Sequence, residues 1–362
     1  MGARTRGIAN QILSDGLDAT DGLSGVVPSS NITNASVTSV SSTPTLGGGF
    51  DKVASDPPSP TEGDIWFNTT SNTVKGYVYA AAAWSTGGNL GTSKRSLGGL
   101  GTKTAGLGMG GFSTSPTSDT SSEEYDGSTW SGGGSMGTGR RNFGSAGTQT
   151  SGLAFGGITS PGTRYLTASE EYNGSSWTAG GSLSGGRDIN YGMGTQTAGL
   201  TTGGFNATNL NTSEEYNGSS WTSGGTLNTA RRGGGRAGTQ TAGVIFGGDE
   251  SGLSSSVEEY DGSSWTTVTA LPAGRESMGS AGIQTSALAI GGLLPSRTGS
   301  TLSYNGTSWS SAPNLNTTRD ALAGDGVSNT SALAFGGDLP GVTNATEEFS
   351  GAAVAVKTLT SS

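Results

Sequence analysis

Paired carboxylates recur along the chain and are the first residues that could do chemistry. Glycoside hydrolases use two carboxylates that flank the bond they cleave. Adjacent side chains of a β-strand point to opposite faces, so two neighbouring carboxylates do not converge on one bond. We therefore predict that one Glu of each pair binds a cation within the fold, and that the pairs are structural. The pairs are Glu170-Glu171, Glu214-Glu215, Glu258-Glu259 and Glu347-Glu348.

Other residue types that enzymes commonly need are missing. The sequence has no His and no Cys, which removes the commonest general base, the commonest metal ligand and the thiol nucleophile. The net charge of −9 argues against a nucleic-acid backbone as partner. No stretch approaches the apolar length of a membrane span. We predict no enzymatic activity, no metal site, no cofactor and no membrane insertion.

The elements that carry these charges belong to an all-β protein. Gly makes up 67 of the 362 residues, and Gly, Ser and Thr are poor formers of long helices. Only 12% of the residues are charged and seven are Trp, which argues against disorder. Many strands joined by turns are what this composition predicts.

A repeat of 44 to 47 residues organises most of the chain. A Tyr stands five residues before each recurring Trp, and a Gly doublet lies between successive Tyr–Trp pairs. A cation follows each Trp by ten residues. The tryptophans are Trp84, Trp130, Trp177, Trp221, Trp265 and Trp309. The cations are Lys94, Arg140, Arg187, Arg231, Arg275 and Arg319. A degenerate copy ends the chain, with Phe349 in the Tyr place and Val354 in the Trp place.

Each repeat predicts four antiparallel strands. In the second repeat these are 142–146, 151–155, 169–172 and 176–178, and Asn173-Gly174 is a strong hairpin turn between the last two. Four strands per period predict the blades of a propeller rather than a solenoid. The small residues of the first strand suit the crowded axis, and we expect the Tyr and Trp rings to wedge between neighbouring blades.

At this point the sequence resembles the kelch family of β-propellers. The resemblance covers roughly residues 85–356 and rests on the Gly doublet after the second strand, the acidic pair before Tyr, and the spacing from Trp to Arg. It implies a kelch-like β-propeller. We favour six blades, whereas a seventh forms if residues 64–84 join the ring.

The N-terminal region has a different composition from the repeats. Residues 1–60 predict an extended arm for virion attachment and oligomerisation, 61–90 a β-hairpin adaptor, and 91–362 the propeller. The segment Gly63-Asp64-Ile65-Trp66-Phe67-Asn68 after a Pro-rich lead resembles a small module of phage tail and fibre proteins. An ordinary hairpin that completes the propeller is the alternative interpretation of this segment.

The connections between the second and third strands vary in length and content, whereas the other turns hardly vary. Variable loops on a repeated scaffold are where recognition usually lies. The cation series falls on the same face of the predicted blades, so we assign it to the rim of a ligand-binding site. The other candidate contacts are Arg164, Tyr165, Asp249, Glu250 and Arg297.

The resemblances together suggest a non-enzymatic phage structural protein that is assembled in the host cytoplasm and located in the virion. It would be a tail fibre or fibre-like component whose propeller binds the host surface, with glycan as the expected ligand, or other virion proteins. Its partners would be virion subunits bound through the arm, and it would be a homo-oligomer. A capsid decoration protein and an intracellular kelch-type interaction adaptor are the alternatives.

Overall fold

A computed structural model describes residues 51–113, 117–160 and 165–359. Within these ranges the regular elements are all strands, with no helix, so the all-β prediction is confirmed. The chain forms two compact units, and the first combines the two ends of the chain: unit 1 is 1–81 with 352–362, and unit 2 is 82–351.

Unit 2 contains six four-stranded sheets, numbered here sheet 1 to sheet 6 in chain order. Sheet 1 consists of β5 (Gly98–Thr102), β6 (Ala105–Met109), β7 (Ser122–Tyr125) and β8 (Trp130–Gly132). Sheet 2 consists of β9 (Gly144–Thr148), β10 (Ser151–Phe155), β11 (Ser169–Tyr172) and β12 (Trp177–Ala179). Sheet 3 consists of β13 (Tyr191–Gly194), β14 (Gly199–Thr202), β15 (Ser213–Tyr216) and β16 (Trp221–Ser223).

The other three sheets follow the same plan. Sheet 4 consists of β17 (Gly235–Gly238), β18 (Gly243–Phe246), β19 (Val257–Tyr260) and β20 (Trp265–Thr267). Sheet 5 consists of β21 (Gly279–Ile283), β22 (Ser286–Ile290), β25 (Thr301–Tyr304) and β26 (Trp309–Ala312), with the short β23 (Leu293–Leu294) and β24 (Ser296–Arg297) in its loop. Sheet 6 consists of β27 (Ala323–Ser328), β28 (Ser331–Phe335), β29 (Thr346–Ser350) and β4 (Ala83–Thr86).

Local sequence explains the four antiparallel strands of each sheet. In sheet 2, Asn173-Gly174 turns the chain between β11 and β12, and Gly174 has a φ of 90° that an L side chain rarely adopts. Gly147, near the end of β9, has a φ of 113°, and a Cβ there would lie 2.2 Å from the carbonyl oxygen of Ser151. The four predicted antiparallel strands are confirmed, although the first runs two residues later than predicted, at Gly144–Thr148, and the fourth one residue later, at Trp177–Ala179. The sheets form a propeller-like repeat.

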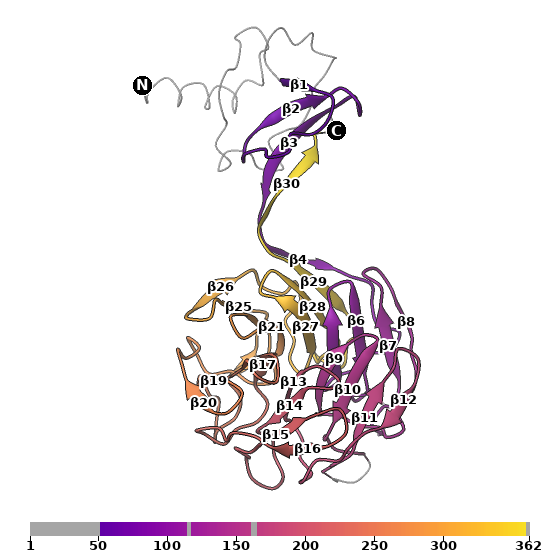
Figure 1. Ribbon diagram of the computed structural model, residues 1–362, viewed down its shortest axis with the longest axis vertical. Helices are drawn as coiled ribbons and strands as arrows, with labels where there is room; N and C mark the ends of the chain where they lie inside the picture. Colours follow the sequence, from indigo (N-terminus) through magenta and orange to yellow (C-terminus); the bar gives the residue numbers. More distant parts are fainter. Residues whose placement is uncertain (1–50, 114–116, 161–164, 360–362) are drawn as a thin grey trace. The chain divides into compact units, whose positions relative to one another are not determined.

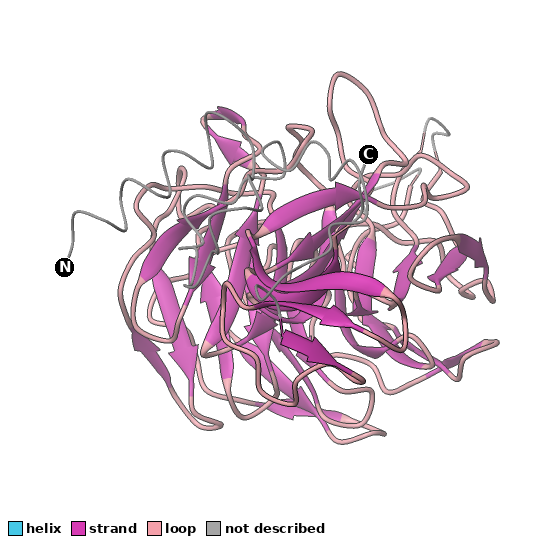
Figure 2. Ribbon diagram, turned by 90° about the horizontal axis from the view of Figure 1, so that it is seen from above, coloured by secondary structure: helices cyan, strands magenta, loops and turns pink. Residues whose placement is uncertain are grey.

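The first strands of the six sheets contact one another in a closed series, β5–β9–β13–β17–β21–β27 and back to β5 (Figures 1 and 2). Just before each of these strands, one backbone N–H donates to the carbonyl of the equivalent residue in the preceding sheet, over 2.6 to 3.2 Å. All six residues have a positive φ, between 49° and 71°. They are Ser96, Asn142, Ile189, Gly233, Ser277 and Ala321. A closed ring of hydrogen bonds thus joins all six sheets.

Sheet 6 is completed by a strand from the other end of the repeat region. β4 pairs with β29, which sets Trp84 opposite Phe349 with ring centroids 5.1 Å apart. The repeat alone predicts Val354 in the Trp place of the last copy, and that prediction is wrong. Val354 lies in β30 (Ala353–Thr358) and pairs with Tyr79 of β3 (Thr73–Ala80), both in unit 1. Because β4 comes from the start of unit 2 and β29 from its end, their pairing joins the two ends of the ring. A fourth strand from the C-terminal side would leave those ends unconnected.

The recurring aromatic rings fill the spaces between sheets, as predicted. Tyr216 and Trp221 of sheet 3 pack with centroids 4.9 Å apart, and Trp221 packs edge-on against Phe155 of sheet 2 at 4.8 Å. The Trp221 indole N–H also donates to the hydroxyl of Ser169 in sheet 2. Such rings bring large apolar area to a chain poor in Leu and Ile.

Unit 1 has one four-stranded sheet, in the order β1 (Asp51–Val53), β2 (Ile65–Asn68), β3 and β30. The Asp56 carboxylate accepts hydrogen bonds from Trp66, Asn68 and Lys75, over 2.7 to 3.1 Å. β2 and β3 pair in antiparallel fashion and form the predicted hairpin. The predicted boundary at 90/91 differs from the division at 81/82 because β4 belongs to sheet 6, and 352–362 joins unit 1 because β30 pairs with β3.

Candidate functional site

The six recurring cations are buried inside unit 2. Their exposed fractions are 0% for Arg140, Arg231 and Arg319, 1% for Lys94, and 3% for Arg187 and Arg275. The sequence predicts an exposed ligand-binding rim for this series. That placement is wrong, because each side chain turns inward against its own sheet and leaves no surface for a ligand.

Four of the five buried arginines pair with a Glu of their own sheet, and sheet 2 gives the pattern. The Arg140 guanidinium pairs with Glu170 at 2.6 Å and donates to the carbonyls of Gly156 and Ala168. Burial lowers the pKa of Arg140, while the charge of Glu170 raises it. Equivalent ion pairs join Arg187 to Glu214, Arg231 to Glu258, and Arg319 to Glu347. The predicted structural role of the first Glu in each pair is therefore confirmed.

The second Glu of each pair binds the next sheet. Glu215 of sheet 3 accepts a hydrogen bond of 2.6 Å from the Tyr260 hydroxyl of sheet 4, and Glu171 does the same for Tyr216. Burial, together with the hydrogen bond to Glu215, raises the pKa of Tyr260 to about 12. Both carboxylates of these pairs are thus occupied by structural contacts, one within the sheet and one between sheets.

The face that carries the variable loops, called here the loop face, contains one equivalent isolated bridge in each of the six sheets. Each bridge joins the residue after a buried cation to the residue after a Gly doublet, so the two kinds of connection meet on one face. The six bridge pairs are Arg95–Phe112, Arg141–Ile158, Asp188–Phe205, Arg232–Asp249, Glu276–Leu293 and Asp320–Asp338. These positions vary more than the buried cations do: the first residue of a pair is Arg, Asp or Glu, and the second is Phe, Ile, Leu or Asp.

Charges on the loop face neutralise one another in short chains of ion pairs. Arg95 pairs with Asp338 at 2.6 Å, and Arg297 pairs with Asp320 at 2.5 Å and Asp338 at 3.3 Å. Arg232 pairs with Asp249 at 2.8 Å. Hydrogen bonding to Asp320 raises the pKa of Arg297, which therefore stays charged. The face offers fixed donors and acceptors together, with little net charge.

Aromatic rings lie under several of these cations. The Arg232 guanidinium is 4.2 Å from the centroid of Phe205, and Arg141 is 5.0 Å from that of Phe112. Tyr165 makes an edge contact with Phe205 at 6.1 Å. These contacts hold the guanidinium planes in place, so the arginine side chains lose less conformational entropy when a ligand binds.

One cleft of about 330 Å³ opens on this face at the junction of sheets 1, 5 and 6. Arg95, Phe112, Arg297 and Asp338 line it, together with Ser113, Gly341 and Val342. Its volume falls at the lower end of the range for small-molecule sites. The two arginines remain partly open to solvent, with 41% and 36% of their side chains exposed.

The remaining predicted contacts divide between this face and the interior. Arg297 lines the cleft, and Asp249 pairs with Arg232 on the loop face. Glu250 instead pairs with the buried Arg231 at 3.3 Å and accepts a hydrogen bond from Ser254. Arg164 lies outside the described residues.

The sequence does not predict most of the loop-face residues, including Arg95, Arg141, Arg232 and Asp338. Their positions could have been found from the repeat, because each follows a recurring cation or a Gly doublet. Their identities could not be found in this way, since a repeat search discards positions that vary.

Two acidic groups of the bridge pairs are perturbed. Burial raises the pKa of Asp188 to about 6, and one oxygen of this carboxylate is buried without a hydrogen bond. Burial also raises the pKa of Glu276, with Asp249 adding to the effect. Among the described residues no three or more His, Cys, Asp or Glu side chains cluster as a metal site. The same part of the chain has no helix able to cross a membrane.

Comparison with known proteins finds no protein-family model that matches this chain and no curated protein that matches it. The loop face is therefore interpreted from its own chemistry.

Proposed function

We propose that this chain is a non-enzymatic structural protein of a phage virion, with a six-bladed, kelch-like propeller carried on an N-terminal attachment unit. Sheets 1 to 6 are the blades, and the propeller binds the host surface through its loop face. The ligand is a glycan. Unit 1, which includes the predicted arm of residues 1–60, binds other virion subunits and makes the protein a homo-oligomer.

The observation that carries the proposal is the contrast between a repeated framework and a varied loop face. The framework fixes Arg140 and its equivalents in the interior, whereas the bridge pairs change from sheet to sheet. Recognition needs this kind of surface, because a rigid scaffold presents loops whose residues can differ. Paired charges and an aromatic floor suit a polyhydroxylated, uncharged ligand, which both donates and accepts hydrogen bonds.

The contacts of the paired carboxylates support the non-enzymatic assignment. The general acids and bases of hydrolysis need free carboxyl groups beside a substrate. Glu170 is held by Arg140, and Glu171 accepts from Tyr216, so neither is available.

The virion assignment is tested by immunogold labelling of purified phage particles with an antibody to unit 2. Label at the tail tip or fibres is the expected result. Label over the capsid would replace the attachment role with a decoration role. An abundant protein in infected cells without label on particles would overturn the assignment and favour an intracellular adaptor.

The glycan assignment is tested on an array of bacterial surface glycans with the full chain and two matched variants. Arg297→Ala removes a cation from the cleft, and we expect at least a tenfold loss of binding, typical of a lost charge-assisted hydrogen bond. Lys103→Ala removes one cation from the β5–β6 turn at the opposite end of sheet 1 and is expected to bind normally. Equal binding by all three proteins would exclude the cleft.

The oligomer assignment is tested by sedimentation of the full chain and of a variant without residues 1–60. The full chain is expected to sediment as an oligomer and the shortened chain as a monomer. An oligomer that survives the deletion would show that the contact lies elsewhere.

A further inference from the structure

The six inner strands share one pattern, and two residues depart from it. The second position is small in five strands, at Gly99, Ser145, Gly192, Ser280 and Gly324, and is Arg236 in β17. The third position is apolar in five strands, at Leu100, Ala146, Met193, Ala237 and Ala281, and is Asp325 in β27. Local rules broken without structural need are expected at functional sites.

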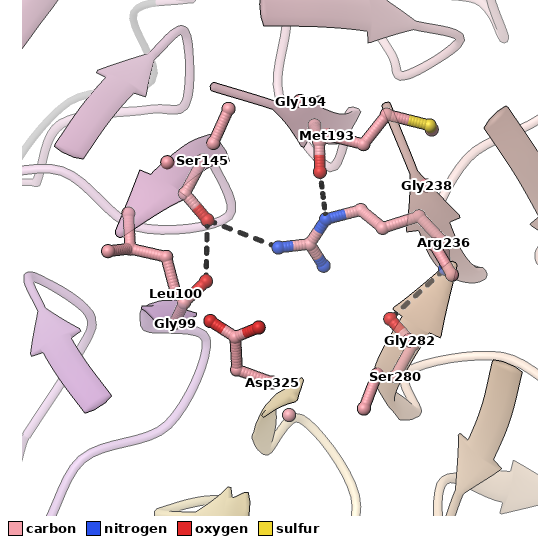
Figure 3. A pocket seen from close by; sticks show the side chains of 16 residues that line it. Gly99, Leu100, Ser145, Met193, Gly194, Arg236, Gly238, Ser280, Gly282 and Asp325 are labelled. Atoms are coloured by element: carbon pink, nitrogen blue, oxygen red, sulfur yellow. Dashed lines mark hydrogen bonds between the residues drawn. The ribbon is translucent and has the colours of Figure 1, made fainter. Parts of the chain in front are cut away.

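Both exceptions point into the same space at the centre of the ring. Figure 3 shows Arg236 and Asp325 directed toward each other from strands that are separated by β21. They line a cavity of about 80 Å³ with residues of all six inner strands. At roughly 30 Å³ for each water of the liquid, this space holds a few waters or one very small solute.

Two nitrogens of the Arg236 guanidinium donate hydrogen bonds that fix its position, and the third does not. Its Nε donates to the carbonyl of Gly192 at 2.5 Å, and Nη2 donates to the Ser145 hydroxyl at 3.1 Å. Ser145 in turn donates to the carbonyl of Gly99. Nη1 makes no hydrogen bond to a described residue, so the Nη1 edge of the guanidinium can donate to an acceptor in the cavity (Figure 3).

Asp325 is also incompletely paired. One carboxylate oxygen accepts from the backbone N–H of Gly326 at 2.7 Å, and the other is buried without any hydrogen bond. No ion pair within 4.0 Å joins Asp325 to Arg236 or to another cation of the described chain. A buried acceptor without a donor is unfavourable, and a donor placed in the cavity would remove this cost.

We propose that this central cavity binds a small zwitterion of the α-amino acid class, whose carboxylate accepts from Arg236 and whose ammonium donates to Asp325. Arg236 is positive and Asp325 is negative, and the two charges are separated across the cavity. A ligand with one negative and one positive group can therefore compensate both. Glycine, with about five non-hydrogen atoms, is the member that matches the space. A lone anion would leave Asp325 unmatched, and a lone cation would leave Arg236 unmatched.

The ionisation of Asp325 gives the site a characteristic pH dependence. Burial raises the pKa of Asp325 to about 7, while the N–H of Gly326 and the charge of Arg236 oppose the rise. Arg236 and Asp325 are the charged groups among the residues that line the cavity from the six strands. An ammonium binds the ionised carboxylate, so affinity for glycine rises as pH increases through about 7. Affinity for acetate does the opposite, because acetate binds beside the protonated acid.

The experiment is calorimetric titration of the full chain with glycine, acetate and methylammonium at about pH 6 and pH 8, on either side of the Asp325 pKa. The variants come from the repeat itself: Arg236→Ser restores the residue type of Ser145, and Asp325→Ala restores that of Ala281. We expect glycine to bind more tightly than either half-ligand, and each variant to weaken it about tenfold or more. Lys103→Ala is the control and binds as the native chain does.

A second measurement needs no variant. Bound glycine stabilises the ionised form of Asp325, so NMR titration of this carboxyl should show its pKa lowered by glycine and unchanged by methanol. Binding of glycine that both variants retain would overturn the proposal. So would acetate binding more tightly than glycine and strengthening as the pH falls, or no binding of glycine with Asp325 unchanged.

Discussion

Sheets 4 and 5 are neighbours with the same topology, but they differ in how their buried Arg is paired. In sheet 4, Arg231 binds Glu258, whereas Leu302 stands in the equivalent place of sheet 5. Arg275 of sheet 5 is 3% exposed and binds only the Ser300 hydroxyl and the carbonyls of Ser300 and Gly291. Hydroxyl and backbone acceptors alone can therefore hold a buried guanidinium here.

A second difference shows that donors and acceptors are lost together. Sheet 5 has Ser303 where its neighbours have the second Glu of the pair. The residue that would donate to this position is Phe349 in sheet 6, which has no hydroxyl. In sheet 4 the matching Glu259 accepts from Tyr304 at 2.9 Å. The repeat therefore tolerates substitution where both partners of a hydrogen bond change together. At Arg275 only one partner changed, because Leu302 replaces the Glu while the Arg remains.

Replacing a buried Arg by Met should destabilise the protein most where the Arg pairs with a carboxylate. Arg140→Met leaves Glu170 as a buried, unpaired carboxylate and should lower the free energy of unfolding by about 3–5 kcal/mol. Arg275→Met leaves only hydroxyl and carbonyl acceptors behind and should cost about 1–3 kcal/mol. Urea unfolding followed by Trp fluorescence measures both. Equal losses would show that the carboxylate is not what makes the pairs important.

Adding the missing carboxylate to sheet 5 tests the same ion pair from the other side. Leu302→Glu gives Arg275 a carboxylate but removes an apolar side chain that is 8% exposed, so the net change should be within about 1–2 kcal/mol. In the Arg275→Met background the new carboxylate has no cation, and its cost should rise by about 2 kcal/mol or more. A double-mutant cycle yields this coupling. A cycle without coupling would mean that the introduced carboxylate does not reach Arg275.

The place of a residue in the fold could be predicted from the sequence where that residue follows the repeat. The four strands, the turns at Asn173-Gly174 and the structural role of Glu170 followed from positions that recur. The inward turn of Arg140 did not follow, because spacing along the chain does not say on which side of a loop a long side chain lies.

Residues that break the repeat could not be assigned from sequence. Trp84 completes sheet 6 because a ring closes by joining its ends, and nothing within one period records which end supplies the strand. Arg236 and Asp325 stand at positions where the other repeats differ, and the position of Arg95 varies between Arg, Asp and Glu. Only the fold brings these three residues to the cleft or the central cavity.

A smaller effect is expected where sheets 5 and 6 meet. Phe349→Tyr should cost about 1–2 kcal/mol, because the new hydroxyl is buried beside Ser303 without the carboxylate that other sheets supply. Ser303→Glu should recover most of this loss in the double variant. The recovery is measured as the shift in the midpoint of urea unfolding, and a double variant that is as unstable as Phe349→Tyr would refute the matched-loss interpretation.

The smallest effect concerns Trp309 of sheet 5, whose indole N–H is buried without an acceptor. The equivalent Trp130 donates to the Thr346 hydroxyl, but Val257 stands in this place for Trp309. Val257→Thr keeps the shape of the side chain and adds the missing acceptor. The gained hydrogen bond should offset the cost of burying the hydroxyl, leaving stability within about 0.5 kcal/mol of the native value.

The matched control is Val244→Thr, which buries a hydroxyl at an equally unexposed site of β18. Val244 lies in the same apolar cluster as Val257 but is not at the position that supplies the indole acceptor in the other sheets. This variant should therefore lose about 1–3 kcal/mol. The difference between the two Val→Thr variants isolates the bond to Trp309. If both lose the same amount, the hydroxyl introduced in place of Val257 does not accept from the indole, and the rule that sheets need matched partners fails at this interface.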